Sequence, residues 1–308
     1  MAQQVIDTTT DHGTYKGDPA KVAFEKVNAN DAELYALVAG LAGVGGANML
    51  INCGVPINQR GFAGGALAAG AYGYDRWKVG PGGGNVVIDP ATGQFNHSSG
   101  PLVQAIESPA WAWGQSLFVS VENPSGPVQV SVGGSTGTIT AGSGRRGVQV
   151  NPSGSGHMVV QLTATGVTYS RPKLERGNAP STFEIVPIAF ELAACKRYFE
   201  KSYNADVAPG SVSVMGARRA SLLTGYIMTA PTVCFEVKKR VAPTLVLYAP
   251  TNGVVGNYSE YDQSGLLVAG RQIAATNVSQ SSFDFINPAG TGIAGNTAAI
   301  HFTADSEI

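Results

Sequence analysis

The stretch VQVSVGGSTGTITAGSGRRGVQVNPSGSGHMVVQLT, residues 128–163, decides the fold. Runs rich in valine at 128–132, 147–150 and 158–163 are separated by clusters of glycine, serine, proline and asparagine. Short runs of β-type residues between such clusters are typical of strands. The clusters at 133–144 and 151–156 are predicted to be loops, with glycines at positive-φ turn positions.

The same pattern extends in both directions along the chain. Further strands are predicted at 86–88, 103–107, 117–121 and 167–170, and together these runs predict a jelly-roll β-sandwich over residues 47–187. A short helix is predicted at 187–199 from the spacing of Ile188, Leu192, Cys195 and Phe199. Strands are then predicted at 211–214, 222–228, 233–237, 244–248, 272–275, 283–286 and 298–304. The fold class is therefore mainly β, with a second sandwich-like domain over 188–308.

The composition excludes several classes of protein. The 308 residues include 40 Gly and 17 Pro, and only 13% are charged, which argues against a helical bundle. A formal net charge of −1 gives no field to attract nucleic acid or anionic lipid. No apolar run is long enough for membrane insertion, and residues 1–10 lack the features of a signal peptide, so we expect synthesis in a cytoplasm.

Cysteine and histidine spacing predicts neither a metal site nor a cofactor. Cys53, Cys195 and Cys234 are far apart and are expected to be reduced and buried. The four histidines share no metal-ligand spacing, and no P-loop or strand–GxGxxG–helix unit occurs. The histidines are His12, His97, His157 and His301.

One long helix is predicted at 18–42, with Asp18 as its capping residue, Pro19 at its first position and Gly43 to Gly46 at its end. Six of its residues follow alternating steps of three and four, which is a heptad seam. They are Phe24, Val27, Asp31, Leu34, Val38 and Leu41. The seam packs either on its own domain or, as we favour, in a parallel coiled coil of identical chains, where Asp31 would fix the register.

Four stretches, in this order, resemble segments of bacteriophage tail fibre proteins. GDPAKVAFEKVNANDAELY at 17–35 resembles a segment near the N-terminus of many such fibres. NMLINCG, INQRG and YDRW at 48–54, 57–61 and 74–77 are similar to the opening of their carbohydrate-binding-module-like jelly roll. PKLERG with STFE, at 172–177 and 181–184, and ELAACKRYF at 191–199 resemble its closing strand and the segment after it. FEVKKRVAPT at 235–244 and FTADSEI at 302–308 complete the match.

The resemblance implies a homotrimeric fibre of a virion, made in the cytoplasm of a host bacterium. Residues 1–46 would attach it to other tail, baseplate or collar proteins, and the two β domains would face bacterial surface polysaccharide. Three weak sugar sites on one trimer would bind with high avidity. Three functions are weighed: a receptor-binding fibre that does not cleave glycans, which we favour; a purely structural fibre; and a polysaccharide depolymerase.

Aromatic residues are the candidate sugar-binding residues, because a flat ring covers the apolar face of a sugar. Trp111 and Trp113 are two apart, which on a strand places both rings on one face; Tyr72 and Tyr74 repeat this spacing. The alternative is that the two tryptophans belong to the jelly-roll core, as we expect for Trp77.

Charged residues near these motifs are given structural interpretations. Asp75 and Arg76 are expected to pair structurally. Glu260 and Asp262 are interpreted as a solvated turn and not as a glycosidase pair. The run at 238–240, KKR, is interpreted as a solvated strand edge. No catalytic residue is therefore predicted.

Overall fold

The structure is a computed structural model that describes residues 6–14, 16–41, 46–226, 228–229 and 231–308, without the side chains of 35–41. Helix α1 (Ala20–Leu41) confirms the predicted helix. The Asp18 carboxylate accepts hydrogen bonds from Lys26 Nζ at 2.6 Å and from the backbone N–H of Asp7 at 2.7 Å. This carboxylate thus ties the segment before α1 to the first turns of the helix.

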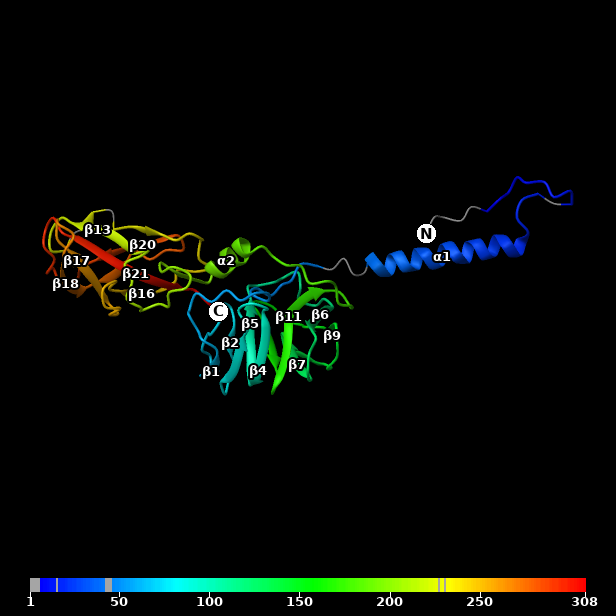
Figure 1. The fold of residues 1–308 in the computed structure, drawn as a ribbon, viewed down its shortest axis with the longest axis horizontal. Helices are drawn as coiled ribbons and strands as arrows, with labels where there is room; N and C mark the ends of the chain where they lie inside the picture. Colours follow the sequence, from blue (N-terminus) through cyan, green and yellow to red (C-terminus); the bar gives the residue numbers. More distant parts are fainter. Residues whose placement is uncertain (1–5, 15, 42–45, 227, 230) are drawn as a thin grey trace.

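The predicted seam of α1 is exposed where the structure describes it. The side chains of Phe24, Val27 and Leu34 are 69%, 38% and 57% exposed, and Asp31 is exposed as well. Val38 and Leu41 lie outside the described side chains. In Figure 1, α1 stands apart from both β domains. The described part of the seam does not pack on its own domain, and its association with other copies stays a prediction.

Residues 65–176 form the predicted jelly roll, in which two antiparallel sheets face each other (Figure 1). The six-stranded sheet has the order β1 (Gly65–Leu67), β3 (Gly84–Ile88), β4 (Gln94–Ser99), β11 (Val167–Arg176), β6 (Leu117–Glu122) and β9 (Arg145–Val150). The five-stranded sheet has the order β2 (Lys78–Val79), β5 (Pro101–Ile106), β10 (Met158–Thr163), β7 (Val128–Val132) and β8 (Ser135–Ile139). All seven predicted strands of this domain are present.

The core of the jelly roll lies between its two sheets. Alternate residues of strands such as β3, β6 and β7 enter it, and Trp77, Phe95 and Tyr169 are completely buried there. The expectation that Trp77 is a core residue is therefore confirmed. The predicted loop at 133–144 is wrong in part, because β8 forms within it by pairing along the whole of β7. Strand pairing outweighs the weak strand propensity of this serine- and glycine-containing segment.

The second β domain is built around β21 (Thr297–Asp305). The larger sheet has the order β14 (Met228–Thr229), β13 (Arg218–Leu222), β21, β17 (Asn257–Tyr261) and β18 (Leu267–Gln272), and β12 (Phe199–Lys201) and β16 (Thr244–Tyr248) also pair with β21. The smaller sheet has the order β15 (Val233–Cys234), β20 (Ser282–Ile286) and β19 (Ala274–Thr276). Their shared core includes Tyr258, Phe283, Phe285 and Phe302.

Some strand predictions for this domain are wrong. Residues 211–214 form no strand, and Val212 remains exposed there. The run at 222–228 splits between the end of β13 and the start of β14, because the chain turns where Gly225 closely approaches the backbone of Gly290. The run at 233–237 shortens to β15. The predictions at 244–248, 283–286 and 298–304 are confirmed.

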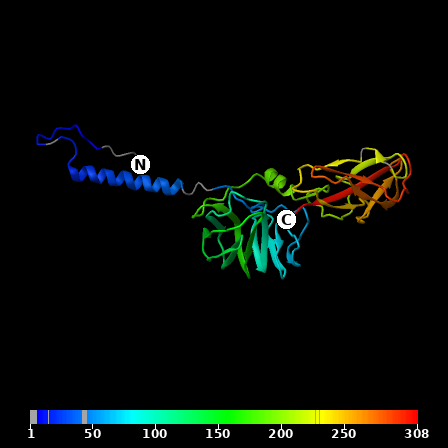
Figure 2. The same ribbon diagram turned by 180° about the vertical axis from the view of Figure 1, so that it is seen from behind.

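Helix α2 (Ile188–Lys196), which was predicted, lies at the junction of the two β domains in both views (Figures 1 and 2). The last residues return from β21 to the jelly roll. The main-chain oxygen of Ile308 accepts hydrogen bonds from Tyr72 Oη at 2.8 Å and Lys78 Nζ at 2.7 Å. The C-terminal segment therefore connects the second β domain to the jelly roll at their junction.

Candidate functional site

The predicted sugar-binding tryptophans lie in a turn between β5 and β6 and not on a strand. Pro109 and Gly114, which has φ of 72°, belong to two successive turns that prevent an extended backbone. Trp111 is 58% exposed. Trp113 packs against the jelly-roll core and donates from Nε1 to the carbonyl of Gly156 at 3.0 Å. The two rings therefore do not share one face, and Trp111 is the exposed aromatic group of the pair.

The two predicted sugar-binding tyrosines both pack against other residues of the chain. Tyr74 is buried in the jelly-roll core, and its hydroxyl accepts a hydrogen bond from the backbone N–H of Ile88 at 2.9 Å. Tyr72 is half-buried at the junction, with Arg60 and Lys78 over its ring. Tyr74 is therefore unavailable as a sugar platform, and that prediction is corrected.

The charged residues of the INQRG and YDRW motifs hold the two β domains together. Arg76 is completely buried and pairs with Glu307, at the C-terminal end of the second domain, while its guanidinium lies 3.5 Å from the ring centre of Tyr198. Arg60 pairs with Asp305 at 3.1 Å and with Glu307 at 3.3 Å. Arg76 is thus structural as predicted, but its partner is distant in sequence and is not Asp75.

Asp75 belongs to the same junction. Its carboxylate accepts hydrogen bonds from the backbone N–H and from Nε2 of Gln59, at 3.1 and 2.6 Å. Gln59 Nε2 also donates to the carbonyl of Phe199, in the second domain, at 2.7 Å. Burial raises the pKa of Asp75 to about 6, because desolvation outweighs these hydrogen bonds.

Two interpretations of charged residues as solvated surface are wrong for Lys239 and Glu260, whereas Lys238 is exposed and Asp262 begins a turn, as expected. Lys239 is completely buried, and its Nζ lies 2.6 Å from the carboxylate of Glu200. Burial lowers the pKa of this lysine. Glu260 is completely buried in β17, where it pairs with Arg271 and accepts from Asn296 Nδ2 at 2.6 Å. Glu200 and Asn296 are distant in sequence from Lys239 and Glu260, whereas Arg271 lies on β18, the strand paired with β17.

A polar cleft of about 310 Å³ opens on the outer face of the five-stranded sheet, over β7, β8 and β10. The valines of β7 point into the core, so the residues between them point outward. Strand pairing arranges six outward side chains in two rows. The rows are Thr163, Gln129 and Thr138, and Gln161, Ser131 and Thr136. Amides and hydroxyls line this cleft without any charged residue.

The tryptophan turn adjoins one end of this cleft. Gly133, in the turn between β7 and β8, packs so closely on Trp113 that an added Cβ would collide with the indole. The cleft therefore adjoins the part of the turn that carries Trp113. The cleft was not predicted from the sequence, because its residues come from three separate strands that only pairing brings side by side.

A groove of about 530 Å³ lies next to the domain junction. Its walls include Tyr248 of β16, Thr303 of β21 and the paired Arg60 and Asp305. The guanidinium of Arg60 lies 3.8 Å from the ring centre of Phe199, which also lines the groove. This groove therefore combines an aromatic ring with the Arg60–Asp305 ion pair, which also connects the two β domains.

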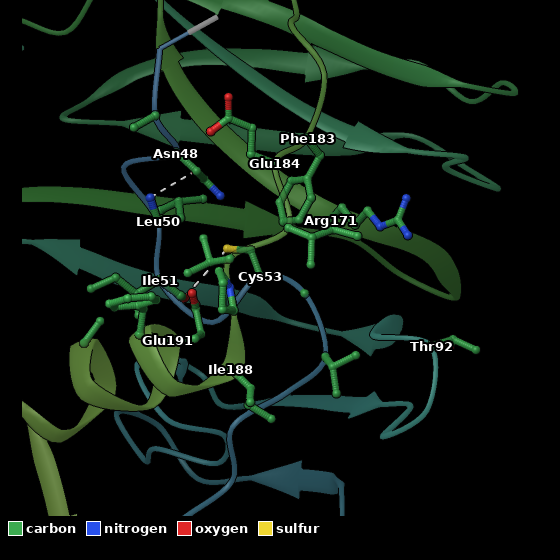
Figure 3. A pocket seen from close by; sticks show the side chains of 18 residues that line it. Asn48, Leu50, Ile51, Cys53, Thr92, Arg171, Phe183, Glu184, Ile188 and Glu191 are labelled. Carbon is green, nitrogen blue, oxygen red and sulfur yellow. Dashed lines mark hydrogen bonds between the residues drawn. The ribbon is translucent and has the colours of Figure 1, made fainter.

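The largest of the three concavities is an apolar pocket of about 550 Å³ between residues 47–55, residues 183–187 and α2 (Figure 3). Leu50, Cys53 and Phe183 line it, together with Ile188 of α2. The Glu191 carboxylate, at the base of α2, accepts a hydrogen bond from the backbone N–H of Asn52. Burial raises the pKa of the Cys53 thiol, and this pocket therefore offers no thiolate.

No cluster of three or more His, Cys, Asp or Glu residues that could hold a metal ion occurs in the described part of the chain. His97 contacts Tyr169 Oη at 3.0 Å, and His301 contacts Ser202 Oγ at 2.9 Å, both inside the fold. Cys53 and Cys195 are buried as predicted, but Cys234 is exposed, which corrects the prediction. Among the described residues, no helix is long and apolar enough to span a membrane.

Comparisons with known proteins give weak structural likeness. No protein-family model and no curated protein matches the chain. Among solved structures, the CBM36-1 domain of a multidomain xylanase from the hindgut metagenome of Trinervitermes trinervoides matches with 19% identity and a TM-score of 0.25, over 33% of this chain and 90% of that domain.

Two larger proteins also match. A putative beta-galactosidase from Bacteroides fragilis shows 16% identity and a TM-score of 0.21, over 68% of this chain and 28% of its own. A cycloisomaltooligosaccharide glucanotransferase from Paenibacillus sp. shows 9% identity and a TM-score of 0.20, over 81% of this chain and 47% of its own. TM-scores this low do not establish a shared fold.

Proposed function

We propose that this protein is a trimeric fibre subunit of a bacteriophage virion that contacts bacterial surface glycans without cleaving them. The observation that carries the glycan part is the polar cleft over β7, β8 and β10; the exposed Trp111, in the turn between β5 and β6, is a second candidate contact. Hydroxyl and amide groups are suited to the hydroxyls of an uncharged sugar, and an indole is suited to its apolar face.

The exposed seam of α1 supports the trimer. Phe24 and Leu34 retain most of their side-chain surface in a single chain, which costs free energy unless another surface covers them. Copies that share this helix would carry three clefts. Individually weak sugar contacts would then add up to high avidity on a polysaccharide that repeats the same sugar. The proposed location of the protein is the virion. The remainder of residues 1–46 would attach the fibre to other virion proteins.

Binding of the full chain to purified host polysaccharide tests the glycan proposal. We expect the double variant Gln129→Ala and Gln161→Ala to weaken binding at least about tenfold, since two polar partners of the sugar are lost. Gln149→Ala is the matched control, because Gln149 is an exposed glutamine on β9 of the opposite sheet. Equal binding by all three proteins would reject the cleft.

The same assay separates the alternatives. Loss of binding in Tyr248→Ala, with the cleft variants unchanged, would move the sugar site to the groove near the junction. A trimer that binds no host polysaccharide and no host cells would be a purely structural fibre. A fall in polymer length during incubation would identify a depolymerase and contradict the proposal.

A further inference from the structure

The polar cleft over β7, β8 and β10 has an exposed apolar side chain beside it. Val160 and Leu162 of β10 are buried in the core, so Val159, Gln161 and Thr163 lie on the outer face. Gln161 and Thr163 line the cleft, whereas Val159 is the next outward residue along the strand and is 48% exposed. The outer face therefore changes from amide and hydroxyl groups to an apolar group within one step of β10.

A glycine keeps the space beside Val159 open. The backbone N–H of Gly133, in the turn after β7, donates to the carbonyl of Val159 at 2.9 Å, and a glycine has no side chain that would cover its neighbour. The indole of Trp113 packs against Gly133, in the place where a Cβ of residue 133 would lie. An apolar group of a bound sugar can therefore reach Val159 from the cleft.

The lining of the cleft favours an uncharged sugar with a group that both donates and accepts hydrogen bonds. Among the described residues that line the cleft, none is charged, and the polar ones carry amides or hydroxyls. An ionised amine or carboxylate of a sugar would lose water there without gaining a countercharge, which costs free energy. Amides and hydroxyls offer both donors and acceptors, so they match a neutral amide of a ligand.

An acetamido group joins a neutral amide and a methyl group in one substituent. The carbons on the two sides of a trans amide are about 3.8 Å apart, so its methyl lies about this far from the sugar ring. Outward side chains two residues apart on a strand are separated by about 6.6 Å. A ring placed over Gln161 thus extends its acetamido methyl toward Val159. A methyl bonded directly to the ring reaches only about 1.5 Å.

We propose that the cleft recognises acetamido sugars of an uncharged polysaccharide, with the amide at Gln161 and Ser131 and the methyl on Val159. This inference rests on the glycan part of the proposed function and names its ligand class. Ser131 lies opposite Gln161 on β7, so both reach the same point of the cleft. Gln161 Nε2 donates to Thr163 Oγ1 at 3.1 Å, which orients the amide before a sugar binds.

Matched pairs of sugars test the ligand class. Saturation-transfer NMR of the full chain compares N-acetylglucosamine, N-acetylgalactosamine and N-acetylmannosamine with glucose, galactose and mannose, which carry a hydroxyl in place of the acetamido group. At least one acetamido sugar is expected to bind at least about fivefold more tightly than its parent hexose, since its methyl is buried and its amide is hydrogen-bonded. Its methyl protons should receive the strongest saturation. Fucose, whose methyl is bonded to the ring, should bind like a hexose.

Val159→Thr tests the methyl contact by itself. Threonine has nearly the shape of valine but carries a hydroxyl in place of one methyl group. The preference for the acetamido sugar over its parent hexose is expected to fall below about twofold, with binding of the hexose unchanged. Val87→Thr is the matched control, because Val87 is 37% exposed on β3 of the opposite sheet and should leave the preference intact. Unfolding curves check that both variants are folded.

The outcomes separate the ligand class from the proposed function. Binding of host polysaccharide, with acetamido sugars no tighter than their parent hexoses or without any signal, would overturn the ligand class and leave glycan binding standing. Tighter binding of fucose, or a preference for the acetamido sugar that survives in Val159→Thr, would overturn it as well. A chain that binds neither these sugars nor host polysaccharide nor host cells would reject the glycan part of the proposed function, and the ligand class with it.

Discussion

The apolar side chains between the two sheets of the jelly roll are buried, whereas those described in the seam of α1 are exposed. Trp77 and Tyr169 are completely buried by their own chain, whereas Phe24 of α1 remains 69% exposed. A sandwich covers two sheets with each other, but a lone helix has one apolar stripe and no second layer. The comparison indicates that the two sheets of the jelly roll bury their apolar side chains within one chain, whereas the described seam residues of α1 remain exposed in one chain.

The largest effect on the free energy of unfolding is expected in the buried core of the jelly roll. Trp77→Ala should lower the free energy of unfolding by about 3–5 kcal/mol, because it leaves a cavity among fully buried neighbours. Urea unfolding measures it. Trp111→Ala is the control and should cost less than about 0.5 kcal/mol, since Trp111 is mostly exposed. Similar losses in both variants would contradict the contrast between core and surface.

A pH-dependent effect is expected at the junction of the two β domains. The pKa of Asp75 is raised from 3.8 to about 6 in the folded chain, so the folded state binds more protons than the unfolded state between these values. Stability contributed by this group therefore falls by up to about 3 kcal/mol as pH rises from 4 to 6.

Asp75→Asn removes the titrating group and should remove this part of the pH dependence. Relative to wild type, the variant should gain stability between pH 4 and pH 7, measured by urea unfolding at each pH. Asp89→Asn is the control, because hydrogen bonds to backbone and side-chain groups lower the pKa of that exposed carboxyl. Parallel pH profiles for wild type and Asp75→Asn would show that Asp75 titrates normally.

The smallest effect on β-domain unfolding is expected in α1. Leu34→Asp should change the free energy of β-domain unfolding by less than about 0.5 kcal/mol, because Leu34 is mostly exposed, yet it should abolish the proposed trimer, which light scattering measures. Ala32→Asp introduces the same charge at an exposed position off the seam and should leave the trimer intact. A trimer that survives Leu34→Asp would place the association elsewhere in the chain.

Patterns that repeat along the chain allowed much of the fold to be predicted. Valine runs gave the strands at 128–132 and 158–163, and helical spacing gave both helices. β8 could not be predicted, since its segment forms a strand only by pairing with β7. Likewise, the tryptophan spacing suggested a shared strand face, but the turn at Pro109 and Gly114 separated the rings.

The sequence alone determined the mainly β fold, the two helices and the apolar seam of α1, because these depend on neighbours a few residues apart. Tertiary structure decided which charges are buried: Arg76 with Glu307 and Lys239 with Glu200 meet only after strands distant in sequence pair. It also decided the polar cleft, whose rows come from three strands. The physical reason is that burial and pairing are properties of three-dimensional contacts, which local patterns do not encode.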